Sequence, residues 1–253
     1  MKDINVNEFK ESSGYEINGV WYPRVTKIVE IKAKPALYRF YASMENFAVG
    51  EQIKEQSAKE GTLVHETVEA FLVGKNPQVE KSIMASVDAF LKFREKNKIK
   101  INPEFVELRL VNENERYAGT LDAIAKIDGK VGILDIKTSQ EIYRDYNLQT
   151  AAYMSAMDGK IPSLETRWIL RIDQAQKCAA CGAVLRKKGG RQKIRQQNWT
   201  PYSRNCSHDW GEMEGIVELK EFPEWHKDYF AFLGAKRLWE WEHENELMEA
   251  GYL

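Results

Sequence analysis

The sequence predicts an α/β protein of the α+β type, in which a central mixed sheet is flanked by helices. Three observations carry this prediction. Helical periodicity dominates the first hundred residues, β-type runs follow, and the tail from Trp225 to Met248 is again helical. An Asp128-Gly129 pair separates two of the β-type runs, which is a strong hairpin signal. This order of elements fits neither a repeat array nor a regular alternation of strands and helices.

Length and composition are compatible with many kinds of globular protein and exclude few. The 253 residues are 43% hydrophobic and 30% charged, which is ordinary for a globular protein. No run of about 18 apolar residues occurs and the amino terminus has no apolar signal-peptide centre, so we expect a cytoplasmic protein with no membrane partner. The net charge of −1 means that any attraction to nucleic acid must come from local patches.

The first part of the chain, residues 1–60, is expected to pack on the core as a hairpin followed by helix. Alternation and glycine punctuation over residues 14–23 predict the hairpin. After Pro35 the pattern becomes helical, with large side chains at three- and four-residue spacing. We expect this stripe to be buried in the core; it consists of Leu37, Phe40, Tyr41, Met44 and Phe47.

The predicted core occupies residues 61–175 and 212–253, and residues 176–211 form an insertion in a hairpin. Periodicity predicts further helices over Ala58–Gly74, Val79–Lys96 and Asn147–Met157. Runs of β-forming residues predict strands over Phe105–Val111, Ala118–Ile127, Val131–Ile136, Thr166–Ile172 and Ile216–Leu219.

Two acids and a lysine on neighbouring strands carry the chemistry. Asp122 and Asp135 sit among apolar residues, where a carboxylate is costly unless it is paired or binds a cation. The hairpin brings their strands together, and period-two geometry puts Asp135 and Lys137 on one face. We expect both carboxylates and the ammonium to share that face, an arrangement suited to Mg²⁺. The alternative is an exposed Asp–Lys pair of little consequence.

Two helical features favour the metal interpretation. His65 lies in an otherwise apolar helix with Glu69 one turn later on the same side. Gln149 and Tyr153 are four residues apart, directly downstream of the acid–lysine strand, and both can hydrogen-bond a phosphate or the lysine. A lone helical histidine is more often a core or surface residue than a metal ligand. The evidence for a metal site is therefore the order of all these groups along the chain rather than His65 alone.

In that order, Gly61-x-x-x-His65, Gly119-Thr120-x-Asp122, Asp135-Ile136-Lys137 and Gln149-x-x-x-Tyr153 resemble the RecB-like branch of the PD-(D/E)XK nuclease superfamily. The resemblance covers roughly residues 20–175 and the terminal helix. It implies a restriction-endonuclease-like core and hydrolysis of DNA, often from an end, in repair, recombination or phage replication. CRISPR adaptation nucleases and the mitochondrial genome-maintenance exonuclease share this branch.

The resemblance also implies a role for each matched residue. Metal ligands for Mg²⁺ or Mn²⁺ are His65, Asp122, Asp135 and the backbone carbonyl of Ile136. Catalytic roles fall to Asp122, Asp135 and Lys137, with Lys137 helping to activate water. Gln149 and Tyr153 support the site and the strand being cut. Glu107 matches a glutamate often found on the preceding strand, although it is equally consistent with a surface charge.

The three cysteines cluster in the insertion. Cys178-x-x-Cys181-Gly is a knuckle, and Cys206 and His208 follow 25 residues or more later. Three thiolates and an imidazole suit a tetrahedral structural zinc site, so we expect a zinc-ribbon-like insertion. The alternative fourth ligand is His226 or water. Some RecB-like nucleases hold an iron–sulfur cluster with four cysteines. This chain has only three cysteines and none before the nuclease motifs, which favours zinc over such a cluster.

The insertion is also basic, since residues 177–205 contain no Asp or Glu. With Trp199 and Tyr202 nearby, it is a candidate DNA-binding surface through phosphate contacts and base stacking. A basic loop that docks a protein partner in a repair or recombination complex is the alternative. The expected nucleic-acid contacts are Arg186, Lys187, Lys188, Arg191, Lys193 and Arg195.

The sequence therefore predicts a metal-dependent DNA nuclease, acting as an exonuclease on single-stranded or end-containing DNA. One rival is a non-catalytic DNA-binding or scaffold subunit that kept the fold. A second is an endonuclease, or an RNA-directed enzyme, that uses the same site. Intact Asp122, Asp135 and Lys137 speak against the scaffold, because binding alone needs none of them in this arrangement.

Overall fold

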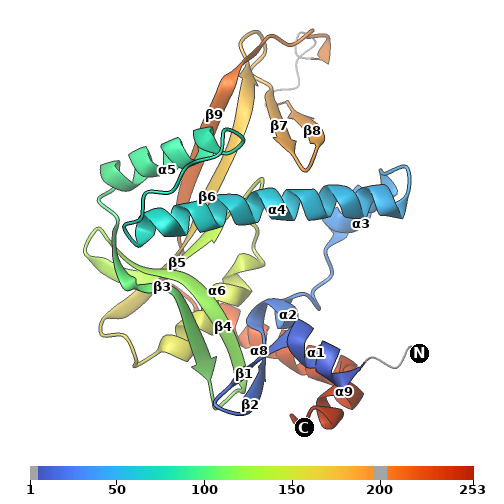
Figure 1. Ribbon diagram of the computed structural model, residues 1–253, viewed down its shortest axis with the longest axis vertical. Helices are drawn as coiled ribbons and strands as arrows, with labels where there is room; N and C mark the ends of the chain where they lie inside the picture. The colour runs from blue at the N-terminus through green and yellow to red at the C-terminus, as the bar shows by residue number, and fades with distance from the viewer. Residues whose placement is uncertain (1–4, 197–203) are drawn as a thin grey trace.

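A mixed sheet forms the centre of the molecule (Figure 1). The computed structural model describes residues 5–196 and 204–253. Within them the strand order is β3-β4-β5-β6-β7-β8, and β9 pairs with the other edge of β6. The strands span Lys100–Asn112 (β3), Tyr117–Ile127 (β4), Lys130–Lys137 (β5), Leu164–Cys178 (β6), Val184–Lys188 (β7), Arg191–Arg195 (β8) and Trp210–Glu221 (β9). The protein is thus α+β, with a mixed multistranded sheet flanked by helices.

The sheet is mixed because its strands are joined in two ways. Asp128 and Gly129 adopt φ values of 49° and 89°, and this tight turn makes β4 and β5 antiparallel. Between β5 and β6 the chain instead crosses over through α6, Tyr146–Met157, so these two strands are parallel. β6 and β9 are antiparallel and frame the insertion.

Helices cover both faces of the sheet and give it two cores. On one face lie α4 (Phe47–Leu72) and α5 (Met84–Lys96), which pack Val68, Val87 and Phe90 against the strands. On the other face lie α6 and α8 (His226–Glu242). Burial on both faces explains why the central strands are apolar almost throughout.

The amino-terminal part packs against the core that lies on the α6 and α8 side of the sheet. Its elements are α1 (Val6–Ser13), the β1–β2 hairpin (Gly14–Ile17 and Val20–Pro23) and α2 (Val25–Val29). Phe9 stacks on Trp239 of α8 at 6.1 Å and tilts against Trp21 at 5.8 Å. The hairpin was expected from the sequence; helices α1 and α2 were not.

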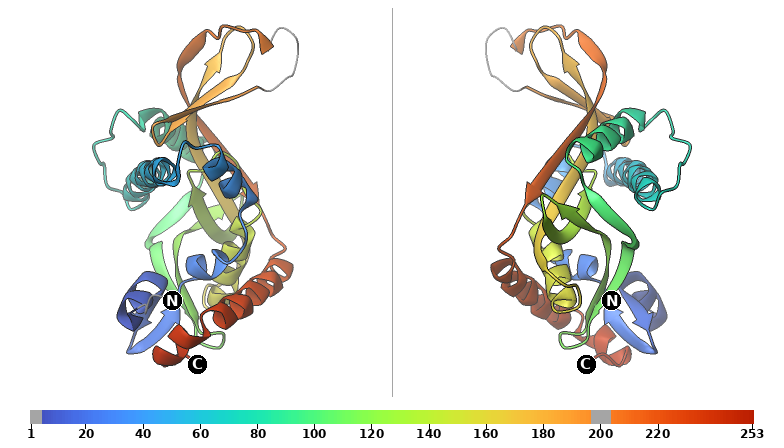
Figure 2. Two further views of the ribbon diagram at one scale, coloured as in Figure 1. Left: turned by 90° about the vertical axis from the view of Figure 1, so that its right-hand side faces the viewer. Right: turned by 90° about the vertical axis from the view of Figure 1, so that its left-hand side faces the viewer.

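β6 and β9 continue beyond the core as a two-stranded arm that carries the insertion (Figure 2). β5 runs beside β6 as far as the Lys137–Arg171 pair. Further along the chain β7 pairs with β6, at Gln176 and Lys177. Both β5 and β7 lie on the side of β6 opposite β9, so the β7–β8 hairpin sits past the carboxyl end of β5.

Several sequence expectations need correction. α3, Pro35–Ala42, buries none of its residues, Met44 is half-buried and Phe47 is 68% exposed, so the expected core stripe is wrong. Amphipathic spacing shows which face of a helix is apolar but not whether a partner covers it. Helix α4 begins at Phe47 rather than near Ala58, because the Asn46 side chain caps it there.

Strands β7 and β8 were not predicted, and β6 and β9 run further into the insertion than the predicted strands Thr166–Ile172 and Ile216–Leu219. Other differences lie at helix ends. α5 begins at Met84 instead of Val79, and the terminal helix breaks at His243 before α9, Glu244–Glu249.

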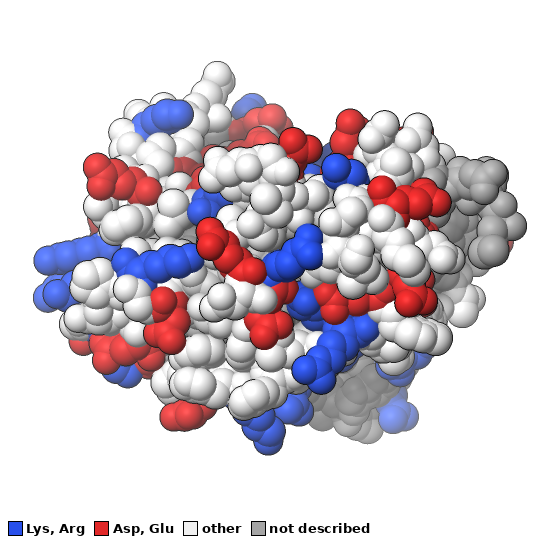
Figure 3. Space-filling model, turned by 90° about the horizontal axis from the view of Figure 1, so that it is seen from below, with Lys and Arg blue, Asp and Glu red and all other residues white. Residues whose placement is uncertain are grey.

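In the described parts of the chain no helix is long and apolar enough to cross a bilayer. On the face around α8 and α9, basic and acidic side chains are interspersed (Figure 3).

The contact of α5 with β9 depends on Gly215. A Cβ there would lie 1.9 Å from the carbonyl oxygen of Ala85. We expect Gly215→Ala to lower the free energy of unfolding by roughly 1–3 kcal/mol, because α5 must shift. Gly234 lies on the exposed side of α8 and has nothing within 4 Å, so Gly234→Ala should raise that free energy by about 0.5–1 kcal/mol. Urea denaturation measures both, and equal effects would contradict the packing described.

Candidate active site

The candidate site lies where β4 and β5 separate. Their last ladder pair on this side is Ala123–Leu134, so Asp122 and Asp135 come one position past it. The Asp122 carboxylate accepts a hydrogen bond from the Ile136 amide, and thereby satisfies a backbone group that the diverging strands leave unpaired. Asp122 is 7% exposed and Asp135 is fully buried. Both acids are therefore held by the sheet itself.

The two acids bind partners from helices on opposite faces of the sheet. The sequence had predicted that both carboxylates would share one face. Asp122 reaches His65 of α4, with 3.1 Å between the Asp122 Oδ2 and His65 Nε2 atoms. Asp135 accepts a hydrogen bond from Gln149 of α6 at 3.3 Å. Strict period-two geometry stops at the end of the ladder, so Asp122 is free to turn toward α4.

His65, Glu69, Glu107 and Asp122 each bring one ligand atom to within 4.8 Å of the others. His65 and Glu69 come from one face of α4 through their four-residue spacing, and their side chains form an ion pair. Glu107 comes from β3 and Asp122 from β4. We call these four residues the acidic group. Asp135 lies outside it.

Backbone strain aims Glu107 into this group. Its φ is 54°, a left-handed conformation that is uncommon for a residue inside a strand. Burial raises the pKa of the Glu107 carboxyl to about 7, and the hydrogen bond with Glu69 and the charges of Glu69 and Asp122 add to this. The alternative of an ordinary surface charge on the strand does not account for either feature.

The positive charge of His65 offsets this concentration of carboxylates. Burial alone disfavours the imidazolium, but hydrogen bonds to Asp122 and Glu69, together with their charges, raise the pKa of His65 to about 10. The pKa of Asp122 is lowered: burial opposes its charge, yet His65, Lys137 and the Ile136 amide outweigh burial. The His65 imidazolium thereby offsets the charges of Asp122 and Glu69. A cation bound by the acidic group would take over this role, because the imidazole that ligates a metal is neutral.

Asp135 and Lys137 form the second half of the site. Lys137 Nζ lies 2.8 Å from Asp135 Oδ1, and burial raises the pKa of Asp135 to about 6. Burial disfavours the Lys137 ammonium, but the charges of Asp135 and Asp122 raise its pKa overall. Gln149 also bonds Tyr153 at 2.9 Å, and Tyr153 packs against Gly119, where a Cβ would approach to 2.6 Å. Asp135, Lys137, Gln149 and Tyr153 thus form one hydrogen-bonded network.

An open pocket of about 470 Å³ gives access to these groups. Its lining includes three members of the acidic group together with Ile136, Lys137 and Thr138. Gly61 of α4 allows Thr138 to come close, because a Cβ at Gly61 would lie 2.7 Å from the Thr138 hydroxyl. The glycine of the Gly61-x-x-x-His65 pattern therefore has a steric role at the pocket wall.

The residues present fit a divalent cation. Oxygen and nitrogen ligands converge in the acidic group. The buried Asp135 Oδ2 atom pairs with the Lys137 ammonium at 2.7 Å, and Asp135 lies outside the group whose ligand atoms converge. The sequence-based ligand set named His65 and Asp122 correctly as neighbours, but it left out Glu69. The four-residue spacing of Glu69 from His65 was the available signal.

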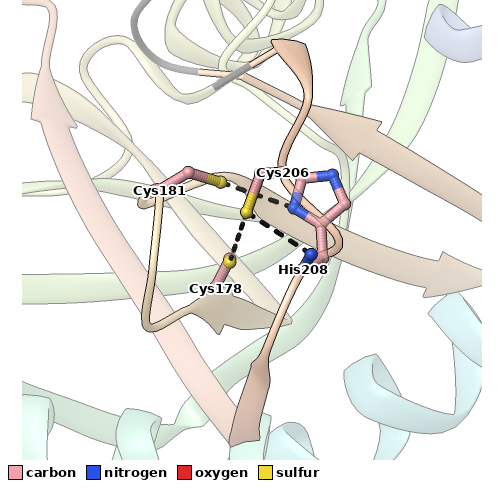
Figure 4. Close-up of side chains that lie close together, drawn as sticks. All are labelled: Cys178, Cys181, Cys206 and His208. Atoms are coloured by element: carbon pink, nitrogen blue, oxygen red, sulfur yellow. Dashed lines mark hydrogen bonds between the residues drawn. The ribbon is translucent and has the colours of Figure 1, made fainter. Parts of the chain in front are cut away.

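The cysteine cluster is a separate group at the end of the arm (Figure 4). Cys178, Cys181, Cys206 and His208 bring their ligand atoms within 4.8 Å of one another. Cys181 Sγ is 3.4 Å from His208 Nδ1, and the Cys178 and Cys206 sulfurs are 3.9 Å apart, too far for a disulfide. His226 instead stacks on Trp225 at the start of α8.

The local backbone prepares this cluster for ligation. The Gly182 amide bonds the Cys178 carbonyl at 2.9 Å, and Gly182 has φ 72°, which closes a tight knuckle. Burial disfavours the Cys178 thiolate, but hydrogen bonds from the Cys181 and Ala180 amides and from His208 lower its pKa to about 6. A thiolate near neutral pH is the form that binds metal.

The expected nucleic-acid contacts lie on β7 and β8, and most already have partners within the chain. Arg186 pairs with Asp173 at 2.6 Å, and Lys188 bonds the Thr138 carbonyl. Arg191 lies over Phe40, Lys193 bonds Gln140 and Arg195 approaches Glu141. Lys187 is exposed on the other side of the hairpin. Trp199 and Tyr202 lie outside the described residues.

Comparison with models of known protein families finds no match for this chain. A search of curated proteins finds no relative either. Function is therefore inferred from the chemistry of the site itself.

The raised pKa of Glu107 has a consequence for stability. Its value of about 7, against an ordinary 4.5, means that the folded state keeps a proton that the unfolded chain has lost, so stability falls as pH rises from about 4.5 to 7. In metal-free buffer at pH 8 we expect Glu107→Gln to stabilise the protein by on the order of 1 kcal/mol, since solvent screens this exposed group. Thermal unfolding measures it. Exposed Glu104→Gln on the same strand is the control, and an equal gain there would contradict this account.

Proposed function

We propose that this protein is a metal-dependent DNA nuclease with a restriction-endonuclease-like core of the PD-(D/E)XK type. The observation that carries the proposal is the meeting of Asp122, Asp135 and Lys137 with His65 at the point where β4 and β5 separate. Structural ion pairs do not need two buried acids, a half-buried lysine and an acidic group beside an open pocket. A site for a cation and an anionic substrate does.

The acidic group and Asp135 would hold Mg²⁺ or Mn²⁺, with the Ile136 carbonyl as the further ligand that the resemblance implies. Such an ion, when bound, neutralises charge on a phosphate and makes hydroxide available near neutral pH. The chain's own part follows from its contacts. Lys137 borders the pocket and carries a charge that Asp135 and Asp122 favour, so it can orient water or stabilise phosphate oxygens.

Gln149 and Tyr153 act behind Asp135 rather than at the pocket surface. Gln149 donates to Asp135 and to the Tyr153 oxygen, and Tyr153 is 2% exposed. They would therefore orient the carboxylate, and the strand-contacting part of their expected role has no support from the pocket lining.

We further propose that the cysteine cluster is a structural zinc site in a zinc-ribbon-like insertion. Three sulfurs and one imidazole nitrogen match the ligand number and type of tetrahedral zinc. Two knuckle hydrogen bonds support this: the Gly182 amide to the Cys178 carbonyl, and the Cys178 amide to the Ala183 carbonyl at 2.8 Å. Among the described residues of the insertion, the buried hydrophobic side chains are Cys178, Ala183 and Leu185, so a bound metal would be a source of its stability.

Cleavage of end-labelled DNA tests the nuclease. With Mg²⁺ or Mn²⁺ the wild-type protein should degrade a linear single strand. Asp135→Asn and Lys137→Ala should each lose roughly 100-fold or more in rate, because each removes a group next to the reacting phosphate. Lys126→Ala, which removes an exposed lysine from β4, is the matched control and should keep full activity.

Substrate form separates the related activities. Loss of activity on circular DNA indicates an exonuclease, equal cleavage of circles indicates an endonuclease, and preference for RNA indicates a different substrate. Binding without any metal-dependent cleavage would support the non-catalytic scaffold and refute the nuclease. Equal rates for the wild type and Asp135→Asn would rule out the site.

Metal analysis tests the zinc proposal. The purified protein should carry one zinc per chain by atomic absorption, and Cys178→Ser, Cys206→Ser and His208→Asn should each reduce that content strongly, because tetrahedral binding needs all four ligands. His226→Asn should leave it unchanged, since His226 packs on Trp225. Full zinc content in His208→Asn would show that the fourth ligand was assigned wrongly.

A further inference from the structure

The β7–β8 hairpin collects five cations on one of its faces. Residues directly opposite in an antiparallel pair point to the same side, and alternate residues of one strand do too. The register pairs Arg186 with Lys193 and Lys188 with Arg191, and it sets Arg195 in line with them. Like charges placed opposite each other are destabilising. We call this side the cationic face; it consists of Arg186, Lys188, Arg191, Lys193 and Arg195.

The cationic face begins at the candidate active site. Arg186 Nη2 and Lys188 Nζ both donate to the carbonyl of Thr138, the residue after Lys137. The tip of the hairpin rests on α4, where the Gly189 amide donates to Glu60 at 3.0 Å. Strand pairing produces this placement, because β7 joins β6 beyond the end of β5.

The five cations divide into an inner pair and an outer three. Arg186 is neutralised by Asp173 at 2.6 Å, and burial lowers the pKa of Lys188 to about 8. The outer three have weaker partners. Lys193 bonds the neutral Gln140 amide at 2.9 Å, and Arg195 is 3.8 Å from Glu141, with both side chains 51% exposed. Arg191 lies over the Phe40 ring at 5.2 Å.

Exposed aromatic residues of α3 and α4 continue this surface. Phe40 packs edge-on against Tyr41 at 5.3 Å, and Tyr41 stacks on Phe47 at 5.0 Å. Phe47 and nearby Tyr38 are 68% and 61% exposed. The contact of Arg191 with Phe40 joins these rings to the cationic face.

We propose that the outer cations Arg191, Lys193 and Arg195, with the aromatic residues of α3 and Phe47, bind single-stranded DNA and lead it to the pocket. The direction toward the pocket rests on the proposed nuclease function; the binding surface does not. Cations follow a phosphate backbone, whereas exposed rings bind only bases that are unpaired. This combination favours a single strand over a duplex, whose bases are stacked inside.

Lys187 provides an internal control. It sits on the same strand between Arg186 and Lys188 and pairs with Gln192, so its side chain projects from the opposite side of the hairpin. It carries the same charge as Lys193 and is also exposed. The sequence alone grouped Lys187 with the other five; the register separates it.

Fluorescence anisotropy with a labelled single-stranded oligonucleotide tests the cations, on zinc-loaded protein without added Mg²⁺ or Mn²⁺ so that no cleavage occurs. Lys193→Ala/Arg195→Ala should weaken binding about tenfold or more. It should also reduce the slope of log affinity against log salt by about 1.4, which is about 0.7 for each lost phosphate contact. Lys187→Ala should stay within about twofold of wild type.

The aromatic part has its own pair of variants. Phe47→Ala should weaken single-strand binding by about fivefold or more without changing the salt slope, because stacking is lost and no ion contact is. Phe230→Ala, on α8 and 72% exposed, removes a ring of similar exposure elsewhere and should have no effect. A duplex of the same sequence should bind more weakly than the single strand.

The outcomes separate this surface from the nuclease proposal. The surface is refuted if the double variant binds as wild type, if Lys187→Ala is equally impaired, or if the duplex binds as tightly through the same residues. Cleavage by wild type with unimpaired hairpin variants would refute the surface and leave the nuclease standing. Single-strand binding through the hairpin without any cleavage would support the surface and refute the nuclease.

Discussion

The separation of β4 and β5 past Ala123 and Leu134 is the feature on which the site depends. It frees the Ile136 amide to bind Asp122 and lets Asp135 remain buried beside Lys137. The result is a concentration of negative charge in a region where two unit charges about 4 Å apart interact by roughly 4 kcal/mol at an effective dielectric constant near 20. His65 and Lys137 offset this repulsion in the absence of a cation, so the arrangement is stable enough to fold yet suited to receive further positive charge.

The sequence predicted the central strands well, because they are marked by physical signals that act locally, but it did not predict β7 and β8. The Asp128-Gly129 turn and the apolar runs on both sides of it identify β4 and β5 almost to the residue. The prediction of helices and their burial was wrong where contacts with residues distant in the sequence decide the outcome. Nothing within residues 35–47 indicates that α3 lacks a covering partner. The short helix α1 packs on the β1–β2 hairpin and α9, and α2 packs on α8, α6 and β4, so distant contacts rather than their own periodicity define them.

Spacing also named the acids and the lysine of the candidate site, but it could not give their directions. Period-two reasoning put Asp122 and Asp135 on one face, and this holds only while the strands remain paired. Glu107 enters the acidic group through a φ of 54°, a backbone state that its residue type does not suggest. Glu69 was visible as a neighbour of His65, and only the approach of α4 to β3 turns it into a fourth ligand candidate.

The insertion is more than an appendage, because β6 serves the core and the arm with one continuous strand. β6 pairs with β5 as far as Arg171, continues through Asp173, and pairs with β7 at Gln176 and Lys177. Only a few residues of β6 therefore separate the β7–β8 hairpin from the end of β5, where Lys137 lies. Asp173 binds Arg186, and Arg186 in turn holds the Thr138 carbonyl. A disturbance of the cysteine cluster therefore has a short covalent and hydrogen-bonded route to the pocket wall. Thr138 lies beside both charged regions: it lines the pocket with three members of the acidic group, and its carbonyl accepts hydrogen bonds from Arg186 and Lys188 of the cationic face. A phosphate chain with a bound cation, the ligand that we propose, would complement both regions.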